Sequence, residues 1–304
     1  MARTFDTGPL REPVGAVEVR RFRHQLAESG ALGEADRVPV RRFVTWFGAA
    51  VLLPILAGQV ATAGFGAPLG VAVAVGGAAL LLVVAVGIVL LRDGGAIGLA
   101  PWRELLRCER FAAANQLEYA PRSQPADFPG IIFKAGLGRD TTHRIASPSG
   151  LYFDCGTHSY LTGAGEDQQL HTWRYLAFSL PGVLPHLLLN SRIDETEPGD
   201  LGEFGAADRI QTLDGVMDES FTLYCRPQHR ADAFYVFTPD VMALLIDHAS
   251  DLDVEVAADW LFFYSRFRLQ VSDPETWARV AVLADKIVPL ISARARSYRY
   301  RELR

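Results

Sequence analysis

The apolar residues of this chain are concentrated in one uninterrupted block. Residues 43–91 contain no Asp, Glu, Lys, Arg or His, and Arg42 and Arg92 border the block directly. One membrane-spanning helix needs about 20 apolar residues, so the block has the length of two spans. Two glycines and a proline within 64–68 favour a turn between them. The pattern predicts a two-helix transmembrane hairpin.

The charges around this block predict its orientation. Eight basic and six acidic residues precede it, and the turn at 64–68 has no charge. Because basic residues favour the cytoplasmic side, both termini are expected in the cytoplasm. The sequence therefore predicts a multi-pass protein of the inner (plasma) membrane, with the lipid bilayer as a partner. Cys108, Cys155 and Cys225 fall in the part assigned to this reducing compartment, where free thiols are expected.

The remainder of the chain has short apolar segments of mixed period. Strands are predicted at 131–133, 143–146, 151–155, 170–180, 187–189, 209–213, 220–225 and 233–237. A closing hairpin is predicted at 253–257 and 260–264. Helices are predicted at 14–29, 101–116 and 238–249, with a last helix opened by Asp273 and Pro274. Many strands with few helices between them favour an antiparallel sheet. The fold class is therefore predicted as membrane-anchored α+β.

Four parts are expected along the chain. They are a cytoplasmic N-terminal arm (1–42), the transmembrane hairpin (43–91), a cytoplasmic α+β domain (92–291) and a basic C-terminal tail (292–304). The tail has five arginines and two tyrosines among its last thirteen residues. Three interpretations are open for it: a membrane anchor with aromatic residues at the headgroups, a helix end whose arginines suit the dipole, or a nucleic-acid contact.

Composition excludes several classes of protein. The chain has 304 residues, a net charge of −5 and 49% hydrophobic residues. It lacks the low hydrophobicity and high charge of disordered chains, and three cysteines are too few for a disulfide scaffold. Residues 92–304 have 22 basic and 29 acidic residues, so nucleic acid is not an expected partner. The mean hydropathy of +0.12 averages the apolar block with this acidic domain.

One stretch of the acidic domain resembles a known family. Residues 213–264 combine a Gly-containing turn, two strands with aromatic residues, a Thr-Pro helix start and an apolar helix. The residues that carry the pattern are Phe221, Tyr224, Ala233, Tyr235, Thr238, Pro239, Met242, Leu244, Leu245, Ile246, Phe262 and Tyr264. This is similar to an uncharacterised bacterial family of membrane-anchored proteins with an N-terminal transmembrane hairpin. The resemblance implies a membrane protein and provides no catalytic residues.

Few residue patterns indicate chemistry. Cys155 and His158 have the spacing of a metal-binding pair, but a structural zinc site needs four ligands and a second close pair is missing. Asp251, Asp253 and Glu255 alternate, which is typical of a solvated face or a charged strand edge and less often of a cation site. No G-x-S-x-G motif occurs. No metal and no cofactor are predicted, and the catalytic residues, if any, are unknown.

Two hypotheses about function follow. The first is a non-enzymatic, membrane-tethered scaffold or interaction module. Its partner would be another membrane or cytoplasmic protein, or a second copy in a homo-oligomer. The second is a membrane-tethered enzyme with a site near Asp154, His158 and His171. These three side chains would have to converge within hydrogen-bond reach for the second hypothesis to hold.

Overall fold

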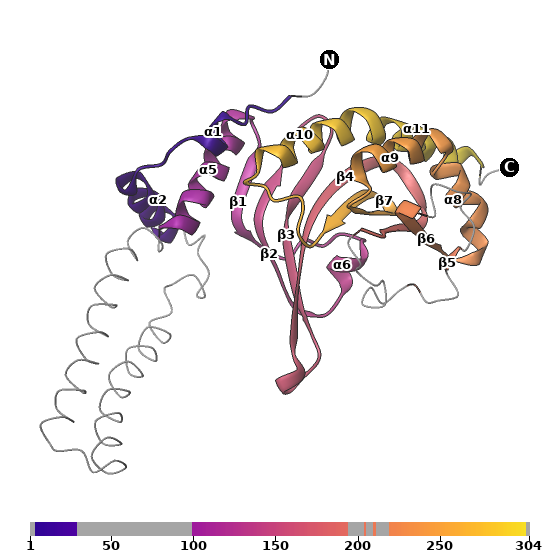
Figure 1. Cartoon of the computed structure of the whole chain (residues 1–304), viewed down its shortest axis with the longest axis horizontal. Helices are drawn as coiled ribbons and strands as arrows, with labels where there is room; N and C mark the ends of the chain where they lie inside the picture. The colour runs from indigo at the N-terminus through magenta and orange to yellow at the C-terminus, as the bar shows by residue number, and fades with distance from the viewer. Residues whose placement is uncertain (1–3, 29–98, 194–203, 205–208, 211–218, 302–304) are drawn as a thin grey trace, which may run out of the picture. The chain divides into compact units, whose positions relative to one another are not determined.

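The computed structural model describes residues 4–28, 99–193, 204, 209–210 and 219–301 (Figure 1). The predicted hairpin at 43–91 lies outside these residues. The chain forms two compact units, residues 1–13 with 105–304 and residues 14–104. Within the second unit, α2 (Ala16–Glu28) confirms the helix predicted at 14–29, with Val19 and Phe22 buried. Helix α5 (Ala100–Ala114) confirms the helix predicted at 101–116.

A seven-stranded antiparallel sheet forms the centre of the first unit (Figure 1). Its strands are β1 (Glu118–Ser123), β2 (Leu137–Ala146), β3 (Phe153–Thr162), β4 (Gln169–Ser191), β5 (Arg209–Ile210), β6 (Phe221–Cys225) and β7 (Asp253–Ser265). Their order is β1-β2-β3-β4-β6-β5, and β7 pairs with β4. Among the described residues all six strand pairings are antiparallel, which confirms the α+β class and the mainly antiparallel sheet.

The long strand β4 connects the two halves of this sheet. Its 23 residues pair with β3 over 169–178, with β7 over 174–189 and with β6 over 187–191. The register with β7 shifts between Ser179 and Leu187, around Pro181 and Gly182. Proline cannot donate a ladder hydrogen bond, so it is placed where a strand bends and changes partners. The strands predicted separately at 170–180 and 187–189 are therefore one bent strand.

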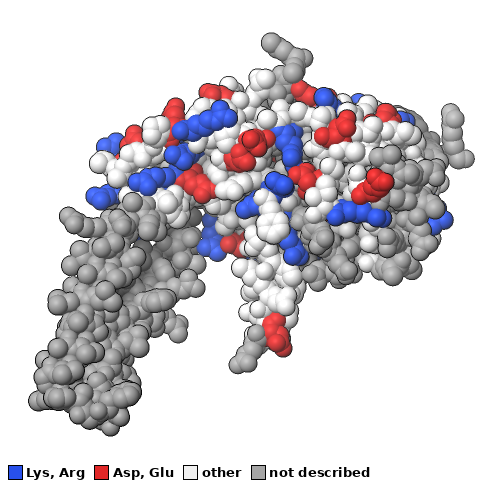
Figure 2. Space-filling view, in the orientation of Figure 1, with Lys and Arg blue, Asp and Glu red and all other residues white. Residues whose placement is uncertain are grey.

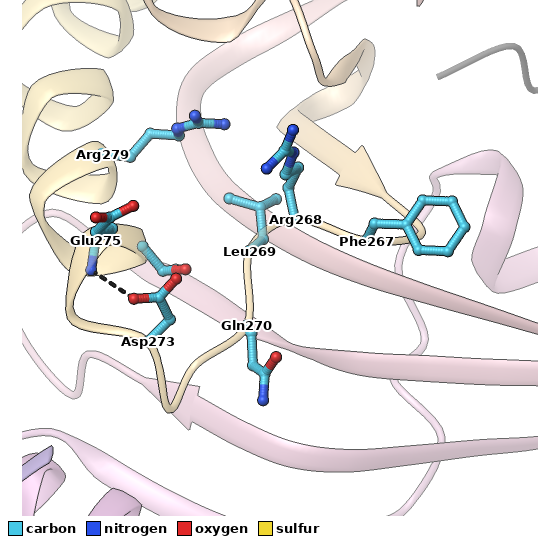
Figure 3. Close-up of a pocket in the computed structure, with 8 residues that line it drawn as sticks. Phe267, Arg268, Leu269, Gln270, Asp273, Glu275 and Arg279 are labelled. Atoms are coloured by element: carbon cyan, nitrogen blue, oxygen red, sulfur yellow. Dashed lines mark hydrogen bonds between the residues drawn. The ribbon is translucent and has the colours of Figure 1, made fainter. Parts of the chain in front are cut away.

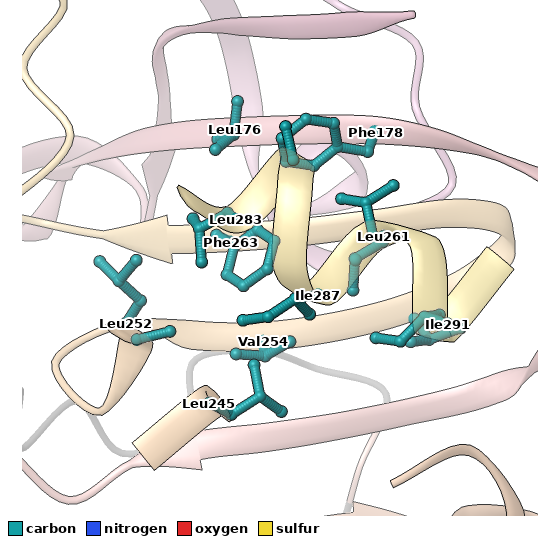
Figure 4. Packing of buried hydrophobic residues seen from close by; sticks show 14 of the residues in the cluster. Leu176, Phe178, Leu245, Leu252, Val254, Leu261, Phe263, Leu283, Ile287 and Ile291 are labelled. Carbon is teal, nitrogen blue, oxygen red and sulfur yellow. The ribbon is translucent and has the colours of Figure 1, made fainter. Parts of the chain in front are cut away.

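Helices cover one face of the sheet and enclose the larger core (Figure 4). They are α8 (Arg230–Val236), α9 (Pro239–Ala249), α10 (Pro274–Val282), a π-helical turn (Leu283–Ile287) and α11 (Val288–Arg301). Leu245 of α9 and Ile287 of the π turn are fully buried in the same cluster as Val254, Leu261 and Phe263 of β7. Burial of such side chains contributes about 1.5–3 kcal/mol each.

The short helix α6 (Ile131–Lys134) covers the opposite face. Phe133 packs edge-on against Tyr175, with ring centroids 5.0 Å apart, and lies 5.7 Å from Phe262. Trp173 is fully buried in the same aromatic cluster. The two faces therefore differ, because the first core is mainly aliphatic and this one is mainly aromatic.

Two strand predictions are wrong, and one predicted hairpin is a single strand. Residues 131–133 form helix α6, and 233–237 fall mostly in helix α8. Short apolar runs have no readable period, so a buried helical turn has the same sequence signature as a buried strand. Residues 253–264 form the single strand β7, which is kinked at Ala258 with φ of 52°. The predicted helix at 238–249 is confirmed as α9, with Thr238 at its N-cap position.

The last helical segment begins as predicted and continues through a proline. Asp273 caps α10 by accepting a hydrogen bond from the Glu275 N–H, and Pro274 lies in the first turn. Pro289 does not end the helix, because the wider π turn at 283–287 precedes it. A proline lacks the N–H that would bond four residues back, and a π turn is one way to accommodate that loss. Tyr298, which one of the three interpretations of the tail places at lipid headgroups, is buried beside Tyr235, with ring centroids 6.1 Å apart.

The predicted location must be corrected. No helix within the described residues has both the length and the apolar character to cross a membrane. Helix α5 has 15 residues, shorter than the roughly 20 needed. The longer helical run at 274–301 carries Glu275, Arg279, Asp285 and Lys286. The prediction of a multi-pass inner-membrane protein with both termini in the cytoplasm is contradicted by this finding and is withdrawn.

The bend of β4 provides a test of the fold. A Cβ atom at Gly182 would lie 2.6 Å from the Ala295 carbonyl oxygen of α11. We expect Gly182→Ala to push α11 from the sheet and lower the free energy of unfolding by about 1–3 kcal/mol. The exposed neighbour Val183, substituted by Ala, should change it by less than about 0.5 kcal/mol. Urea unfolding of the full chain measures both, and equal stabilities would contradict the packing of α11 on β4.

Candidate functional site

The three residues proposed for an enzyme site lie on one face of the sheet without converging. Asp154 and His158 are four residues apart on β3, and His171 of β4 pairs with Tyr160, so all three share the face that carries α6. Asp154 and His158 are separated by about 13 Å along the strand, since each residue rises about 3.3 Å. No hydrogen bond joins any two of them, and each has its own partner.

Asp154 is the centre of a buried ion pair. Its carboxylate accepts hydrogen bonds from Arg144 Nε at 2.7 Å and from the Tyr175 hydroxyl at 2.8 Å, and Arg144 Nη2 lies 2.6 Å away. Burial raises the pKa of Asp154, and the Arg144 guanidinium opposes that shift. Burial and the negative charge of Asp154 raise the pKa of Tyr175 well above its usual value. These contacts satisfy the carboxylate and hold β2, β3 and β4 together.

Each of the two histidines is held by a threonine hydroxyl of a neighbouring strand. His158 Nδ1 lies 3.1 Å from the Thr141 hydroxyl, and burial, followed by the charge of Arg139, lowers the pKa of His158 to about 4. The folded protein therefore keeps this ring neutral at physiological pH. His171 Nε2 lies 2.7 Å from the Thr162 hydroxyl, and its ring stacks on Tyr160 with centroids 5.0 Å apart.

The expectation that Asp253 and Glu255 belong to a solvated face or a charged strand edge is wrong, because both side chains are fully buried. Glu255 on β7 is fully buried, and its Oε atoms lie 2.6 Å from His186 Nε2 and 2.6 Å from the Tyr264 hydroxyl, which donates to it. The Ile131 N–H also donates to it at 3.1 Å, which ties α6 to the sheet. Burial, followed by the Glu255 charge, raises the pKa of Tyr264 well above its usual value. Alternation shows which residues share a face, but not that α6 covers the face.

The described residues contain no group of three His, Cys, Asp or Glu side chains that could hold a metal ion. The Cys155 and His158 pair is divided between the two faces of β3, because an odd spacing reverses the side chain. Cys155 Sγ is 3.4 Å from the Ile145 carbonyl oxygen and belongs to the aliphatic core. Cys108 and Cys225 are likewise buried free thiols.

A polar pocket of about 120 Å³ lies between the end of β7 and α10 (Figure 3). Arg279 Nη1 lies 2.8 Å from an Asp251 oxygen, and Arg268 Nε lies 3.3 Å from the other. Asp273 is occupied by capping α10. Both arginines of this pocket pair with Asp251, which lies outside its lining, and we assign the pocket a structural role in fastening α10 to the loop after β7.

The clearest exposed feature of the described chain is the projecting sheet, defined here as residues 137–140, 159–162 and 169–173 of β2, β3 and β4. The β3–β4 hairpin extends beyond the body, and η2 (Gly165–Asp167) forms its tip (Figure 1). β1 reaches only to Thr141 of β2, and β7 reaches only to Arg174 of β4. The ends of three strands therefore extend past their neighbours. The tight turn needs Gly163, whose φ is +77° and whose Cβ would lie 2.4 Å from the Asp167 carbonyl oxygen.

A row of three leucines crosses the projecting sheet. Leu137 pairs with Leu161, which pairs with Leu170, so the three side chains lie side by side on one face. This face is opposite the one that carries α6, because Leu161 and Tyr160 are adjacent on β3. Leu137 is 77% exposed and Leu170 is 68% exposed. The surface here is largely uncharged, with acidic atoms at the tip and basic atoms near the base (Figure 2).

The two open edges of the projecting sheet differ. The β2 edge carries Arg139, which donates to the Lys134 and Ala135 carbonyls, and then Asp140, which is paired with Arg122. Such charges are a usual guard against pairing with other chains. The β4 edge, Gln169–Trp173, has no charged side chain and no proline, and among the described residues no strand pairs with its outer side. This edge is an unguarded template for another strand.

No protein-family profile and no curated protein matches this chain. The crystal structure of the mycobacterial trehalose monomycolate transport factor A, TtfA, is similar at 10% sequence identity and a TM-score of 0.35. The similarity covers 59% of this chain and 94% of that chain. At this TM-score the likeness supports no statement about function.

The Asp154 ion pair provides a pH-dependent test. Replacing Arg144 by Met leaves a buried carboxylate without its cation, which should cost about 3 kcal/mol at pH 7, near the low end for buried pairs because Arg144 is 32% exposed. Folding raises the pKa of Asp154, so the folded state holds the proton of this carboxyl more tightly than the unfolded state does. The free energy of unfolding therefore falls as pH rises from about 4, where the unfolded carboxyl loses its proton. Without Arg144 that pKa rises further, and the loss should grow between pH 4 and pH 7.

The matched control is Arg122→Met. Arg122 also contacts an aspartate through Nε and Nη2, but Asp140 is 27% exposed whereas Asp154 is fully buried. Loss of a partly exposed pair should cost about 0–1 kcal/mol at either pH. Urea unfolding at pH 4 and pH 7 compares the two variants. Equal costs, or a cost for Arg144→Met that shrinks as pH rises, would contradict a buried and desolvated Asp154.

Proposed function

We propose that this chain is a non-catalytic interaction module and that the projecting sheet is its docking element. The observation that carries the proposal is the leucine row of Leu137, Leu161 and Leu170 beside the unguarded edge at 169–173. Exposed apolar patches on folded domains typically mark surfaces that bind other molecules. A leucine row costs solubility and contributes nothing to the core, so its place on a projecting element favours binding.

Two kinds of contact are available to a partner chain at this surface. Strand addition at an open sheet edge supplies main-chain hydrogen bonds, and adjacent side-chain positions supply specificity. Burial of a leucine contributes about 1.5–3 kcal/mol, so the row adds affinity to the backbone pairing. A lipid surface fits less well, because Asp167 at the tip would be repelled by anionic headgroups. A polypeptide is therefore the proposed class of partner.

The contacts of Asp154 and His171 agree with a non-catalytic role. Asp154 is held by Arg144 and Tyr175, and His171 is held by Thr162. A catalytic base needs to reach a substrate proton through space that a substrate can enter. The strongest contacts of these side chains instead join neighbouring strands, which supports a structural role for them.

Photo-crosslinking in cells tests the proposal. A benzophenone amino acid is placed at Leu170 or, as a matched control, at Val183 of the full chain. Both are aliphatic residues on β4, 68% and 65% exposed, but only Leu170 belongs to the projecting sheet. We expect a protein adduct at position 170 in several-fold excess over position 183. Equal yields at the two positions, or no adduct at 170, would refute the docking role.

A further inference from the structure

The open edge of β4 has a defined length and two defined ends. Residues 169–173 lack an outer neighbour among the described strands, because β7 stops at Ser265, opposite Arg174. At the other end the chain enters the turn at Gly163–Gln168. A partner strand therefore has room for five residues in line with β7. We infer that this strand is the same edge of a second copy of the chain, an inference that rests on the proposed docking role.

The length of the edge determines the register of this pairing. In an antiparallel pair of identical strands, one residue faces its own copy across a two-fold axis. His171 is the middle residue of 169–173, so an axis at His171 uses the whole open segment and ends where β7 begins. Leu170 of one copy then faces Thr172 of the other. Any other symmetric register either leaves part of the edge unpaired or collides with Ser265.

This register keeps the leucine rows of both copies on one surface. Residues that face each other in an antiparallel sheet point to the same side, so Leu170 and Thr172 of the two copies share a face. The two three-stranded projections then join into one six-stranded sheet, with Leu137, Leu161 and Leu170 of each copy along it. Pairing removes the unguarded edge and brings the two apolar rows together.

Charges at the two ends of the edge are complementary in this arrangement. The turn carries Asp167, which is exposed, and the base of the edge carries Arg174 and Arg266 where β7 ends. Arg174 Nη1 donates to the Arg266 carbonyl at 3.1 Å, so the two residues are neighbours. Because the strands run in opposite directions, the turn of each copy lies beside the arginines of the other. The pairing therefore has two symmetric sets of opposite charges.

Cysteine pairs test both the partner and the register. Two differently tagged full-length chains are expressed together, one with Leu170→Cys and one with Thr172→Cys, and oxidised with copper phenanthroline. Residues directly opposite have Cβ atoms about 4.5–5.5 Å apart, close to disulfide geometry, whereas diagonal positions are about 7–8 Å apart. We expect the mixed pair to form several-fold more dimer than two Leu170→Cys chains or two Thr172→Cys chains.

Two controls set the background. The unsubstituted chain has only buried thiols, and Leu137→Cys places an exposed thiol on the guarded β2 edge. Neither should give the mixed-pair yield. Asp167→Lys in both copies should lower that yield several-fold through repulsion from the arginines, whereas Asp259→Lys, an exposed site on β7, should not. An unchanged yield with Asp167→Lys would overturn the charge arrangement.

The outcomes separate this inference from the docking role. If the mixed pair does not exceed the same-residue pairs and the adduct at position 170 contains a different polypeptide, self-pairing is wrong and the docking role stands. If position 170 gives no adduct and the mixed pair gives no disulfide, both are wrong. A mixed-pair dimer in excess of every control supports the second copy as the partner.

Discussion

The organisation of this protein depends on the unequal lengths of β4 and its neighbours. β4 has 23 residues and β7 has 13, so no single strand can pair with β4 along its whole length. The structure accommodates the difference with three partners and a bend at Pro181 and Gly182. On the side of β4 that β3 occupies, β6 pairs with the C-terminal residues 187–191, but on the other side the five N-terminal residues extend past β7. The open edge, which we propose as a docking site, is a direct consequence of this excess length.

The two faces of the sheet carry different cores. Helices α9 and α11 close an aliphatic core on one face, while α6 closes an aromatic core that contains the buried carboxylates Asp154 and Glu255. Each carboxylate is bonded to groups from two or more elements, so it fixes the register of strands as well as compensating its own burial.

The sequence predicted most of this architecture where a period or a cap was readable. The alternation over 170–180 marked β4, and Asp273 with Pro274 marked the start of α10. The strand prediction failed at Ile131–Lys134, because a run of three or four buried residues has no measurable period. The leucine row could not be foreseen, since Leu137, Leu161 and Leu170 become neighbours only through strand pairing. His186 and Glu255 meet for the same reason, across 69 residues.

Amide hydrogen exchange of β4 tests whether the edge at 169–173 is open in one chain and covered by a second copy. Alternate amides of 169–173 bond to β3 and stay protected, whereas those that point to the open edge should exchange quickly in dilute full-length protein and become protected as its concentration rises. Peptides covering 174–178, which lie between β3 and β7, should be protected at every concentration. Protection of 169–173 that is complete at the lowest concentration would show that the edge is already covered within one chain. Fast exchange at every concentration would show that no second copy pairs with it.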